Sequence, residues 1–325
     1  MRVLLALGGN AMTAPDGTAT PTAQIEAIGV AMQAAAALVA AGHDLVITHG
    51  NGPQVGNILV KNELAAHVVP PVPLDWCGAQ TQGTIGYTIL NALQARLAEL
   101  GLDRPVAAVI TRTLVDESDP GMTHPTKPIG RYLTAEQARP MIDHGQIWQN
   151  RGEHGWRRIV ASPEPVHILD VGTVTTLLSD GFVVIAAGGG GIPVVRDADG
   201  TLRGVEAVID KDLTAALLAR NVGADVLVIA TDVDHAMLDF GTPHAQPITR
   251  VSLPQMGRYA AAAHFASGSM GPKVDAAMRF VAAGGARSVI TSLAHITAAV
   301  QGHFGTVIDG IGTAMDISAR SGGSP

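Results

Sequence analysis

Short, continuously apolar segments recur along the chain, and segments with helical spacing lie between them. The apolar segments are RVLLAL (residues 2–7), DLVIT (44–48), VAAVIT (106–111), VVIAA (183–187), DVLVIAT (225–231) and RSVITS (287–292). The first two precede the expected helices at 24–41 and 53–66. Buried strands that alternate with helices are typical of a parallel sheet with both faces covered. The pattern therefore predicts an α/β fold with a mainly parallel sheet.

The composition allows a large core and disfavours several kinds of partner. Hydrophobic residues make up 47% of the 325 residues and charged residues 15%, which suits one large domain or two smaller lobes. Aromatic residues make up 3%, the net charge is −7, and Lys and Arg form no run, so we expect no nucleic-acid partner. The apolar segment after Met1 is too short for a signal peptide or a membrane span, so we expect a cytoplasmic protein with no membrane partner.

The segment 116–165 interrupts the strand–helix rhythm. It is rich in Pro, Gly, Trp and charge, as in DPGMTHPTKPIGRY and NRGEHGWRR, and it lies between two strand–helix units. We interpret it as an inserted subdomain or lid rather than a linker. Its expected small core consists of Tyr132, Ile142, Ile147, Trp148 and Trp156. The tail at 314–325 is expected to be flexible.

Glycine-rich segments follow three of the expected strands. They are LGGN (7–10), HGNGPQVG (49–56) and AGGGGIPV (187–194). Ligands of open parallel sheets bind at the carboxyl ends of the strands, and glycine N–H groups there can bind anions, with Asn10 and Asn51 as further donors. The chain has neither the P-loop motif nor G-x-G-x-x-G before a helix, which disfavours P-loop NTPases and dinucleotide dehydrogenases.

Three lysines are candidates for the positive charge that a phosphate requires. Lys127 lies in HPTKPIG, Lys211 in VIDKDL, and Lys273 in SGSMGPKVDAAMRF. Lys273 stands where a helix should begin, with Pro272 suited to its first position, although this end of a helix disfavours cations. Each lysine is either solvated or placed to bind an anion.

The acidic residues beside Lys211 have two expected roles. Asp212 is a good N-cap for the helix expected at 213–222. Asp210 is then free to orient ammonium groups or to bind a metal.

The chain offers no evident nucleophile, general base or metal site. A lone cysteine, Cys77, forms neither an intramolecular disulfide nor a thiolate zinc site, and we interpret it as structural. His49 is favoured as a structural hydrogen-bonding residue, and the other histidines lack the spacing of metal ligands. Direct transfer between anions, catalysed by positioning and charge neutralisation, fits this set of residues.

Several motifs together resemble the amino acid kinase family and, within it, the carbamate kinases. They are ALGGNA, HGNGPQVGN, PLDWCGAQTQGTIGY, TKPIG, GWRRIVASPEP, GGGGIPVV, GVEAVIDKD and GSMGPK, and they span nearly the whole chain. The resemblance implies a three-layer αβα sandwich over 1–313 with 116–165 as a protruding subdomain, in a homodimer. It also implies the reaction ATP + carbamate ⇌ ADP + carbamoyl phosphate, usually run toward ATP, with Mg²⁺ carried by the nucleotide.

The resemblance further implies a role for each matching residue. The catalytic residues would be Lys127, as a mobile cation of the subdomain, Lys211 and Lys273, with Asp210 orienting the lysines. The carbamate and phosphate groups would contact Gly8, Gly9, Asn10, Gly50, Asn51, Gly52, Gly189 and Gly190. The nucleotide would contact Thr231, Asp232, Val233, Phe240, Met270 and Lys273.

Some positions depart from the family pattern. Arg131 replaces a usual Pro, Phe240 a common Tyr, and Thr242 a common Lys, which bears on the lid and on nucleotide affinity. Two alternatives remain: another acyl-phosphate kinase of the family, and a non-catalytic sensor of carbamoyl phosphate or nucleotide.

Overall fold

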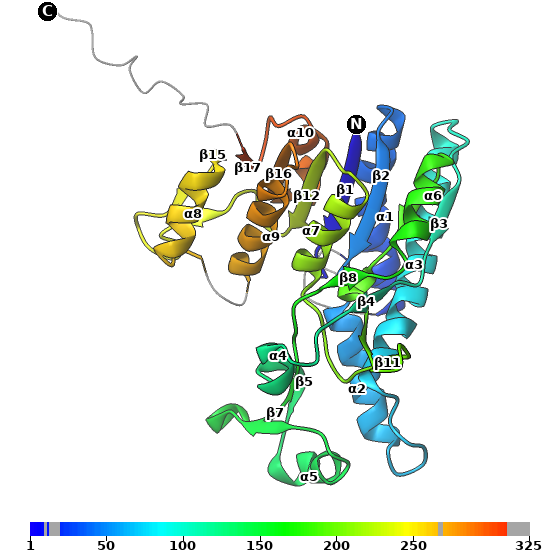
Figure 1. Cartoon of the computed structure of the whole chain (residues 1–325), viewed down its shortest axis with the longest axis vertical. Coiled ribbons are helices and arrows are strands. Elements are labelled where there is room, and N and C mark those ends of the chain that lie inside the picture. Colours follow the sequence, from blue (N-terminus) through cyan, green and yellow to red (C-terminus); the bar gives the residue numbers. More distant parts are fainter. Residues whose placement is uncertain (10–11, 13–19, 266–268, 311–325) are drawn as a thin grey trace, which may run out of the picture.

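A twisted eight-stranded sheet forms the centre of the molecule (Figure 1). The computed structural model describes residues 1–9, 12, 20–265 and 269–310. The strand order is β15-β17-β16-β12-β1-β2-β9-β3; β15 and β17 are parallel to each other and antiparallel to the remaining strands. The strands are β1 (Arg2–Leu7), β2 (Asp44–His49), β3 (Val106–Ala108), β9 (Val183–Ile185), β12 (Val226–Thr231), β15 (Arg250–Ser252), β16 (Arg287–Ser292) and β17 (Thr306–Asp309).

Helices cover both faces of this sheet. One layer consists of α1 (Pro21–Ala40), α3 (Leu74–Glu99) and α10 (Ile296–Val300); the other consists of α6 (Val171–Ser179), α7 (Lys211–Asn221), α8 (Leu253–Ala261) and α9 (Met270–Ala282). Successive side chains of a strand point to opposite faces, so Leu4 packs under the second layer and Leu5 under the first. The predicted three-layer αβα sandwich with a mainly parallel sheet is confirmed.

Within the large sheet, the apolar segments predicted six strands and missed two short ones. β1, β2, β12 and β16 lie within one residue of the predicted bounds. β15 and β17 were not predicted. Both are short, and β17 runs antiparallel to β16 without a crossover helix, so the strand–helix rhythm gives no sign of them.

α1 is the one described helix that is long and apolar enough to cross a membrane by length and composition. Its buried side chains, among them Ile28, Met32 and Leu38, pack against the sheet and α3. Such packing is that of a core helix, since an apolar face needs a partner inside the fold.

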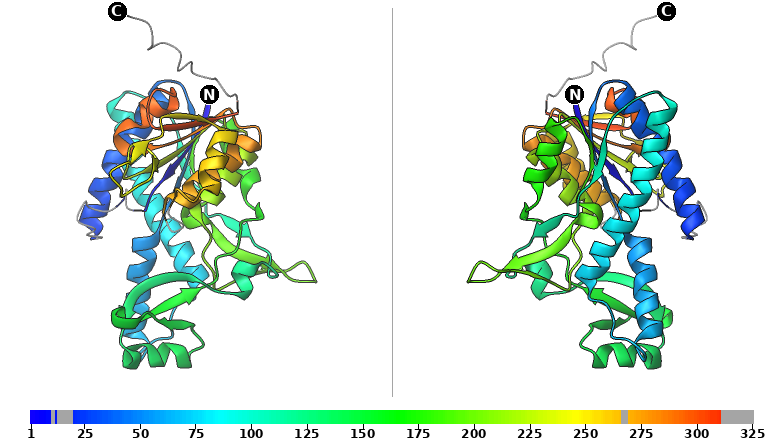
Figure 2. Two further views of the ribbon diagram at one scale, coloured as in Figure 1. Left: turned by 90° about the vertical axis from the view of Figure 1, so that its left-hand side faces the viewer. Right: turned by 90° about the vertical axis from the view of Figure 1, so that its right-hand side faces the viewer.

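A small lobe protrudes from the sandwich, at the lower end in Figures 1 and 2. It contains α4 (Pro120–Thr123), β5 (Lys127–Leu133), α5 (Ala135–Asp143), β6 (Trp148–Asn150) and β7 (Trp156–Val160), with strand order β5-β7-β6. The boundaries 116–165 stay a prediction, as do those of the main domain.

Part of the expected core of this lobe is wrong. Trp148 is buried, and Ile142 and Trp156 pack beside it, but Tyr132 is 44% exposed and Ile147 54% exposed. Leu133 and Trp148 are the next residues along the chain and take the inward positions, which turns their neighbours outward.

The lobe packs against α2 (Gly52–Ala65), the helix that begins in the second glycine segment. Ile129 of β5 packs with Val55, Ile58 and Leu59 of α2 in one apolar cluster. This contact fixes the base of the lobe beside the glycine loops.

The remaining strands form two smaller sheets. One contains β4 (Arg112–Leu114), β8 (His167–Ile168), β10 (Ile192–Arg196) and β11 (Leu202–Gly204); the other contains β13 (Met237–Leu238) and β14 (Gln246–Pro247). The first connects the lobe to the sandwich, because β4 precedes the lobe in the chain and β8 follows it.

We expect Phe280→Ala to lower the free energy of unfolding by about 3 to 5 kcal/mol, because it removes a large buried ring without refilling the space. Phe280 is 1% exposed and lies where α9 packs on the sheet. Urea denaturation measures the effect. Phe240→Ala is the matched control: Phe240 is 75% exposed, and its removal should change stability by less than about 0.5 kcal/mol. Equal losses for both variants would contradict this packing.

Candidate active site

A cleft of about 680 Å³ opens at the carboxyl ends of the central strands, between the sandwich and the protruding lobe. The strand register brings Leu7 beside His49 and Ala230, so the segments after β1, β2 and β12 meet at one edge. The predicted residues that line the cleft are Gly8, Gly9, Gly50, Asn51, Gly52, Lys127, Gly189, Asp210, Lys211, Thr231, Asp232 and Lys273. Residues from seven separate segments of the sequence thus converge, as the topology of open parallel sheets dictates.

The other predicted residues lie elsewhere. Gly190 is buried behind the loop, where its carbonyl accepts hydrogen bonds from Thr113 and Thr214. Val233, Phe240 and Met270 are absent from the lining. Asn10 lies outside the described residues.

The glycine loops pack too closely to hold side chains. A Cβ on Gly50 would lie 2.7 Å from the N atom of Gly9, and a Cβ on Gly189 would lie 2.1 Å from Nδ2 of Asn51. Gly189 also has a φ of 67°, in the left-handed region that glycine favours. The loops therefore bring bare backbone to the cleft, although the Asn51 amide already donates a hydrogen bond to Thr81 Oγ1 at 2.9 Å.

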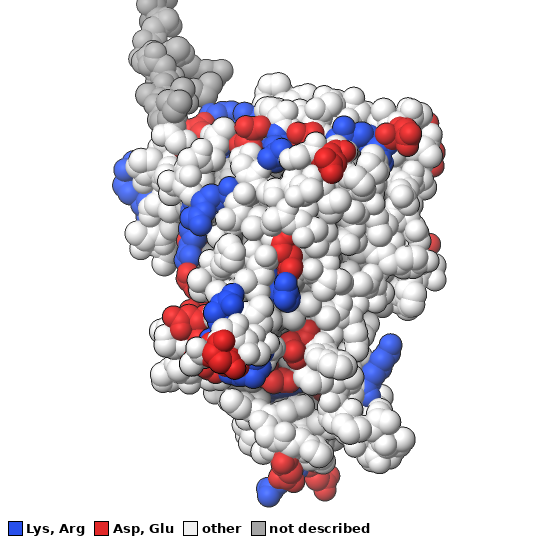
Figure 3. Space-filling view, turned by 45° about the vertical axis from the view of Figure 1, so that its right-hand side comes forward, with Lys and Arg blue, Asp and Glu red and all other residues white. Residues whose placement is uncertain are grey.

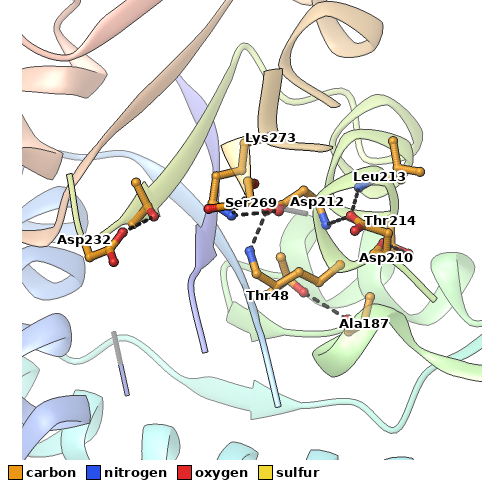
Figure 4. A network of polar contacts seen from close by, with 11 residues as sticks. Thr48, Ala187, Asp210, Asp212, Leu213, Thr214, Asp232, Ser269 and Lys273 are labelled. Carbon is orange, nitrogen blue, oxygen red and sulfur yellow. Dashed lines mark hydrogen bonds and ion pairs between the residues drawn. The ribbon is translucent and has the colours of Figure 1, made fainter. Parts of the chain in front are cut away.

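Two lysines from different helices share one buried carboxylate. Figure 4 labels this carboxylate, Asp212, and one of the lysines, Lys273. Asp212 Oδ1 lies 2.5 Å from Lys211 Nζ, and Asp212 Oδ2 lies 3.4 Å from Lys273 Nζ. The Asp212 side chain is 4% exposed. Burial opposes its ionisation, but the two ammonium groups outweigh burial and lower the pKa of Asp212 below its ordinary value of 3.8.

The expected roles of the two aspartates are wrong. Asp210, not Asp212, is the N-cap of α7: its Oδ1 accepts hydrogen bonds from the N–H groups of Asp212 and Leu213. Asp212 then stands in the first turn of the helix, and it is the carboxylate that holds the lysines. A helix that begins two residues earlier than expected exchanges the roles of the two side chains.

The position of Lys273 at a helix start also has a physical explanation. α9 begins at Met270, so Lys273 is its fourth residue and Pro272 its third. Proline is tolerated at this position because the N–H groups of the first turn have no acceptor within the helix. Lys273 Nζ turns back toward the Ser269 carbonyl, 3.4 Å away, and toward Asp212. The carboxylate offsets the unfavourable field of the helix end.

His49 and Cys77 are structural, as expected. Burial lowers the pKa of His49 to about 4, and its Nδ1 donates to the Gly50 carbonyl at 2.9 Å. Its ring packs against Gly188, which supports two glycine loops at once. Cys77 is buried, and burial raises the pKa of its thiol, so the reactive thiolate is disfavoured.

The protruding lobe contributes three cations to the cleft: Lys127 and Arg131 of β5, and Arg157 of β7. Arg131 Nε lies 2.9 Å from Glu63 Oε2 on α2, so this departure from the family pattern joins the lobe to the sandwich. The sequence analysis did not name Arg157 as a site residue. The motif GWRR, in the family-like block 155–165, is the feature of the sequence that could have pointed to it.

Known proteins share this sequence and architecture. The model of the amino acid kinase family matches residues 1–292. The chain belongs to the amino acid kinase family. Its αβα sandwich, glycine loops and lysine-lined cleft are therefore those of a kinase family member.

Individual relatives are similar over nearly their full length. The carbamate kinase of Pyrococcus horikoshii is 41% identical over 310 residues, which cover 94% of this chain and 98% of the relative. The carbamate kinase-like protein YahI of Escherichia coli is 43% identical over 311 residues, with the same coverage. The structure of the Giardia lamblia carbamate kinase bound to AMP-PNP superposes with a TM-score of 0.90 at 38% identity and covers 95% of this chain and 98% of its own.

We expect Asp212→Asn to destabilise the protein by about 2 to 3 kcal/mol at pH 7, because it leaves two partly buried ammonium groups without a counter-ion. The folded-state pKa of Asp212 is lowered, so its contribution is present above about pH 4 and is lost as the pH falls through the folded pKa. The stability difference from the parent, measured by urea denaturation from pH 7 to pH 3, should therefore shrink at low pH.

Asp143→Asn is the matched control for this measurement. Asp143 pairs with Arg139 on the exposed surface of α5, with 62% of the side chain accessible. Its loss should cost less than about 1 kcal/mol. A cost for Asp212→Asn no larger than that of the control would show that the lysines do not depend on Asp212.

Proposed function

We propose that this chain is a carbamate kinase, which transfers a phosphoryl group reversibly between ATP and carbamate. The observation that carries the proposal is the arrangement of Lys211 and Lys273 on one buried carboxylate, beside three glycine loops. Positioned cations and backbone N–H groups are what phosphoryl transfer requires of a protein. The similarity to named carbamate kinases over nearly the whole chain identifies the acceptor.

The transfer needs no side-chain base. Toward carbamoyl phosphate, a carbamate oxygen forms a bond to the γ-phosphorus while the bond to the bridging oxygen of ADP breaks; toward ATP, the terminal oxygen of ADP attacks and carbamate leaves. Both nucleophiles are already anionic, so no proton has to be removed. Lys211 and Lys273 stabilise the equatorial oxygens, and the N–H groups of Gly9 and Gly52 orient the small acceptor. The Gly50 N–H instead donates to the Leu7 carbonyl at 2.9 Å and holds its loop in place.

Each end of the cleft has a proposed occupant. Thr231, Asp232 and Lys273 lie on the side of β12 and α9, where we place the nucleotide; Val233 and Met270 continue these segments, and Phe240 offers an exposed ring. Lys127 reaches in from the lobe toward the transferred phosphoryl group. The roles of Gly8, Asn10, Asn51, Gly189 and Gly190 in binding carbamate and phosphate remain part of the proposal.

The residues present fit Mg²⁺ that enters with the nucleotide. Within the described ranges, no three His, Cys, Asp or Glu side chains are grouped to hold a metal. Asp210 and Asp232 line the cleft and offer the oxygen ligands that Mg²⁺ prefers, with nucleotide phosphates as its main ligands. When bound, Mg²⁺ neutralises phosphate charge.

We also propose that two copies pair through α3 and β3. β3 is an outermost strand of the large sheet, Tyr87 of α3 is 64% exposed, and Ile110 is 53% exposed. No charged residue occurs between Trp76 and Ala95. Figure 3, in which this side of the molecule comes forward, shows a broad area without charged side chains. The cores of subunit interfaces are depleted in charged residues and enriched in aromatic ones, which fits this uncharged area with its exposed Tyr87.

Sedimentation tests the pairing. The parent should sediment as a dimer, and Ile110→Glu as a monomer, because the substitution would bury an unpaired charge. A parent that sediments as a monomer at micromolar concentration would refute the interface. We expect the protein in the cytoplasm, which fractionation of cells would check.

One assay tests the function. Purified protein with ADP, Mg²⁺ and carbamoyl phosphate should produce ATP, detected by a coupled luciferase reaction. If an amino acid and ATP instead give an acyl phosphate, the protein is another kinase of the family. Tight binding of carbamoyl phosphate without turnover indicates a sensor.

We expect Lys273→Ala to lower kcat by about a hundredfold to a thousandfold, which corresponds to roughly 3 to 4 kcal/mol of lost transition-state stabilisation. Circular dichroism should show a folded protein, since the Lys273 side chain lies at the cleft. Lys61→Ala is the matched control: Lys61 is exposed on α2 and does not line the cleft. Near-normal turnover of Lys273→Ala would refute the role of this lysine.

A further inference from the structure

The arginines of the protruding lobe differ in whether a carboxylate neutralises them. Arg131 pairs with Glu63, Arg139 with Asp143, and Arg158 with Glu206. Arg157 also belongs to the lobe and lines the cleft, but it forms no ion pair with any described residue. The charge of Arg157 is therefore available to a ligand, whereas a carboxylate of the protein already neutralises each of the three paired arginines.

Arg157 is nevertheless held in place. Its guanidinium carbon lies 4.9 Å from the centre of the Tyr132 ring, and its Nη1 donates to the Tyr132 hydroxyl at 3.4 Å. The ring of His154 also lies beside Tyr132, with 5.5 Å between the ring centres and a tilt of 39°. A guanidinium stacked on an aromatic ring keeps its edge N–H groups directed outward and loses little freedom when it binds an anion.

One donor of Arg157 has no partner. Its Nε is inaccessible to water and forms no hydrogen bond with any described residue. A buried donor without an acceptor costs free energy, and a small movement of the guanidinium toward a ligand oxygen would remove that cost. The movement would present Nε and Nη2 together as the two-pronged edge that binds two oxygens of one phosphate or carboxylate.

The strand pairing places Arg157 on the lobe side of the cleft. Arg157 of β7 pairs with Tyr132 of β5, and β5 rests on α2. α2 begins at Gly52, within the loop assigned to the small acceptor. The nucleotide side, at Thr231 and Ser269, is built from β12 and α9 instead.

We propose that Arg157 is a further substrate-binding residue, which binds oxygens of the acyl phosphate from the side of the lobe, facing Lys211 and Lys273 across the cleft. This inference rests on the proposed function and adds a residue to it. Tyr132 acts as a positioning residue, because it contacts Arg157 and not the substrate.

Arg157→Gln tests the inference. Removal of a charge-assisted contact to phosphate should raise the KM for carbamoyl phosphate by about tenfold or more while the KM for ADP changes less than about twofold. Arg157→Lys, which keeps the charge but not the two-pronged edge, should show an intermediate increase. Tyr132→Leu should also raise the KM for carbamoyl phosphate, and it leaves the Arg157 side chain intact. Thermal unfolding of each variant checks that the lobe is folded.

Arg151→Gln is the matched control, since Arg151 is an exposed arginine of the same lobe that does not line the cleft. An equal increase in KM for Arg151→Gln would indicate a general charge effect and overturn the inference. A KM for carbamoyl phosphate within twofold of the parent in Arg157→Gln would overturn it as well.

Calorimetric binding separates this inference from the proposed function. If the parent makes no ATP but binds carbamoyl phosphate or inorganic phosphate, the kinase assignment fails, and weaker binding by Arg157→Gln still supports the anion contact. Equal binding by parent and variant contradicts it. A parent that binds neither probe overturns both.

Discussion

One buried carboxylate organises the cationic side of the cleft. Two ammonium groups on neighbouring helices repel each other, and this repulsion would turn each lysine toward solvent in the absence of an anion. Asp212 attracts both, and because it lies in the first turn of α7 its position is fixed by the cap at Asp210. The carboxylate thus replaces part of the charge of the ligand in the free protein, which keeps two lysines in position before a phosphate arrives.

The two lysines can bind a phosphoryl group only if the neighbouring loops leave space for it. Gly50 packs against Gly9 and against the Lys211 side chain, and Gly189 packs against Asn51. The close approach of these backbones follows from the parallel register of β1, β2 and β9, because each loop leaves the sheet at the same edge. The sheet therefore determines both where the N–H groups lie and how near the lysines stand to them.

Local signals explain what could be predicted from the sequence. Apolar runs and glycines mark β1, β2, β12 and the loops after them. The three lysines were candidates from their local sequence, and the family-like blocks implied their roles. The exchange of roles between Asp210 and Asp212 could not be foreseen, because either aspartate is a good cap and a shift of two residues decides which one faces the lysines. Asn10 remains a prediction.

Arg157 escaped for a different reason. Its position depends on how two strands of the lobe pair, and nothing local to GWRR shows that its second arginine faces Glu206 while its first faces the cleft. Tyr132 is a large aromatic residue and was therefore expected in the core of the lobe. Strand alternation instead turns its side chain outward, where it contacts Arg157.

The cleft divides its positive charge between two bodies. Lys211 and Lys273 belong to helices packed on the central sheet, whereas Lys127 and Arg157 belong to a lobe joined to α2 through Ile129 and Arg131. Asp212 holds Lys211 and Lys273 in the absence of a ligand. On the lobe side Arg131 pairs with Glu63, whereas Lys127 and Arg157 have no carboxylate partner among the described residues. An anion between the two sets therefore gains contacts from both, and the lobe gains the counter-charge that it otherwise lacks. A ligand that drew the lobe cations inward would also act on the packing of β5 against α2, because these two elements are in contact.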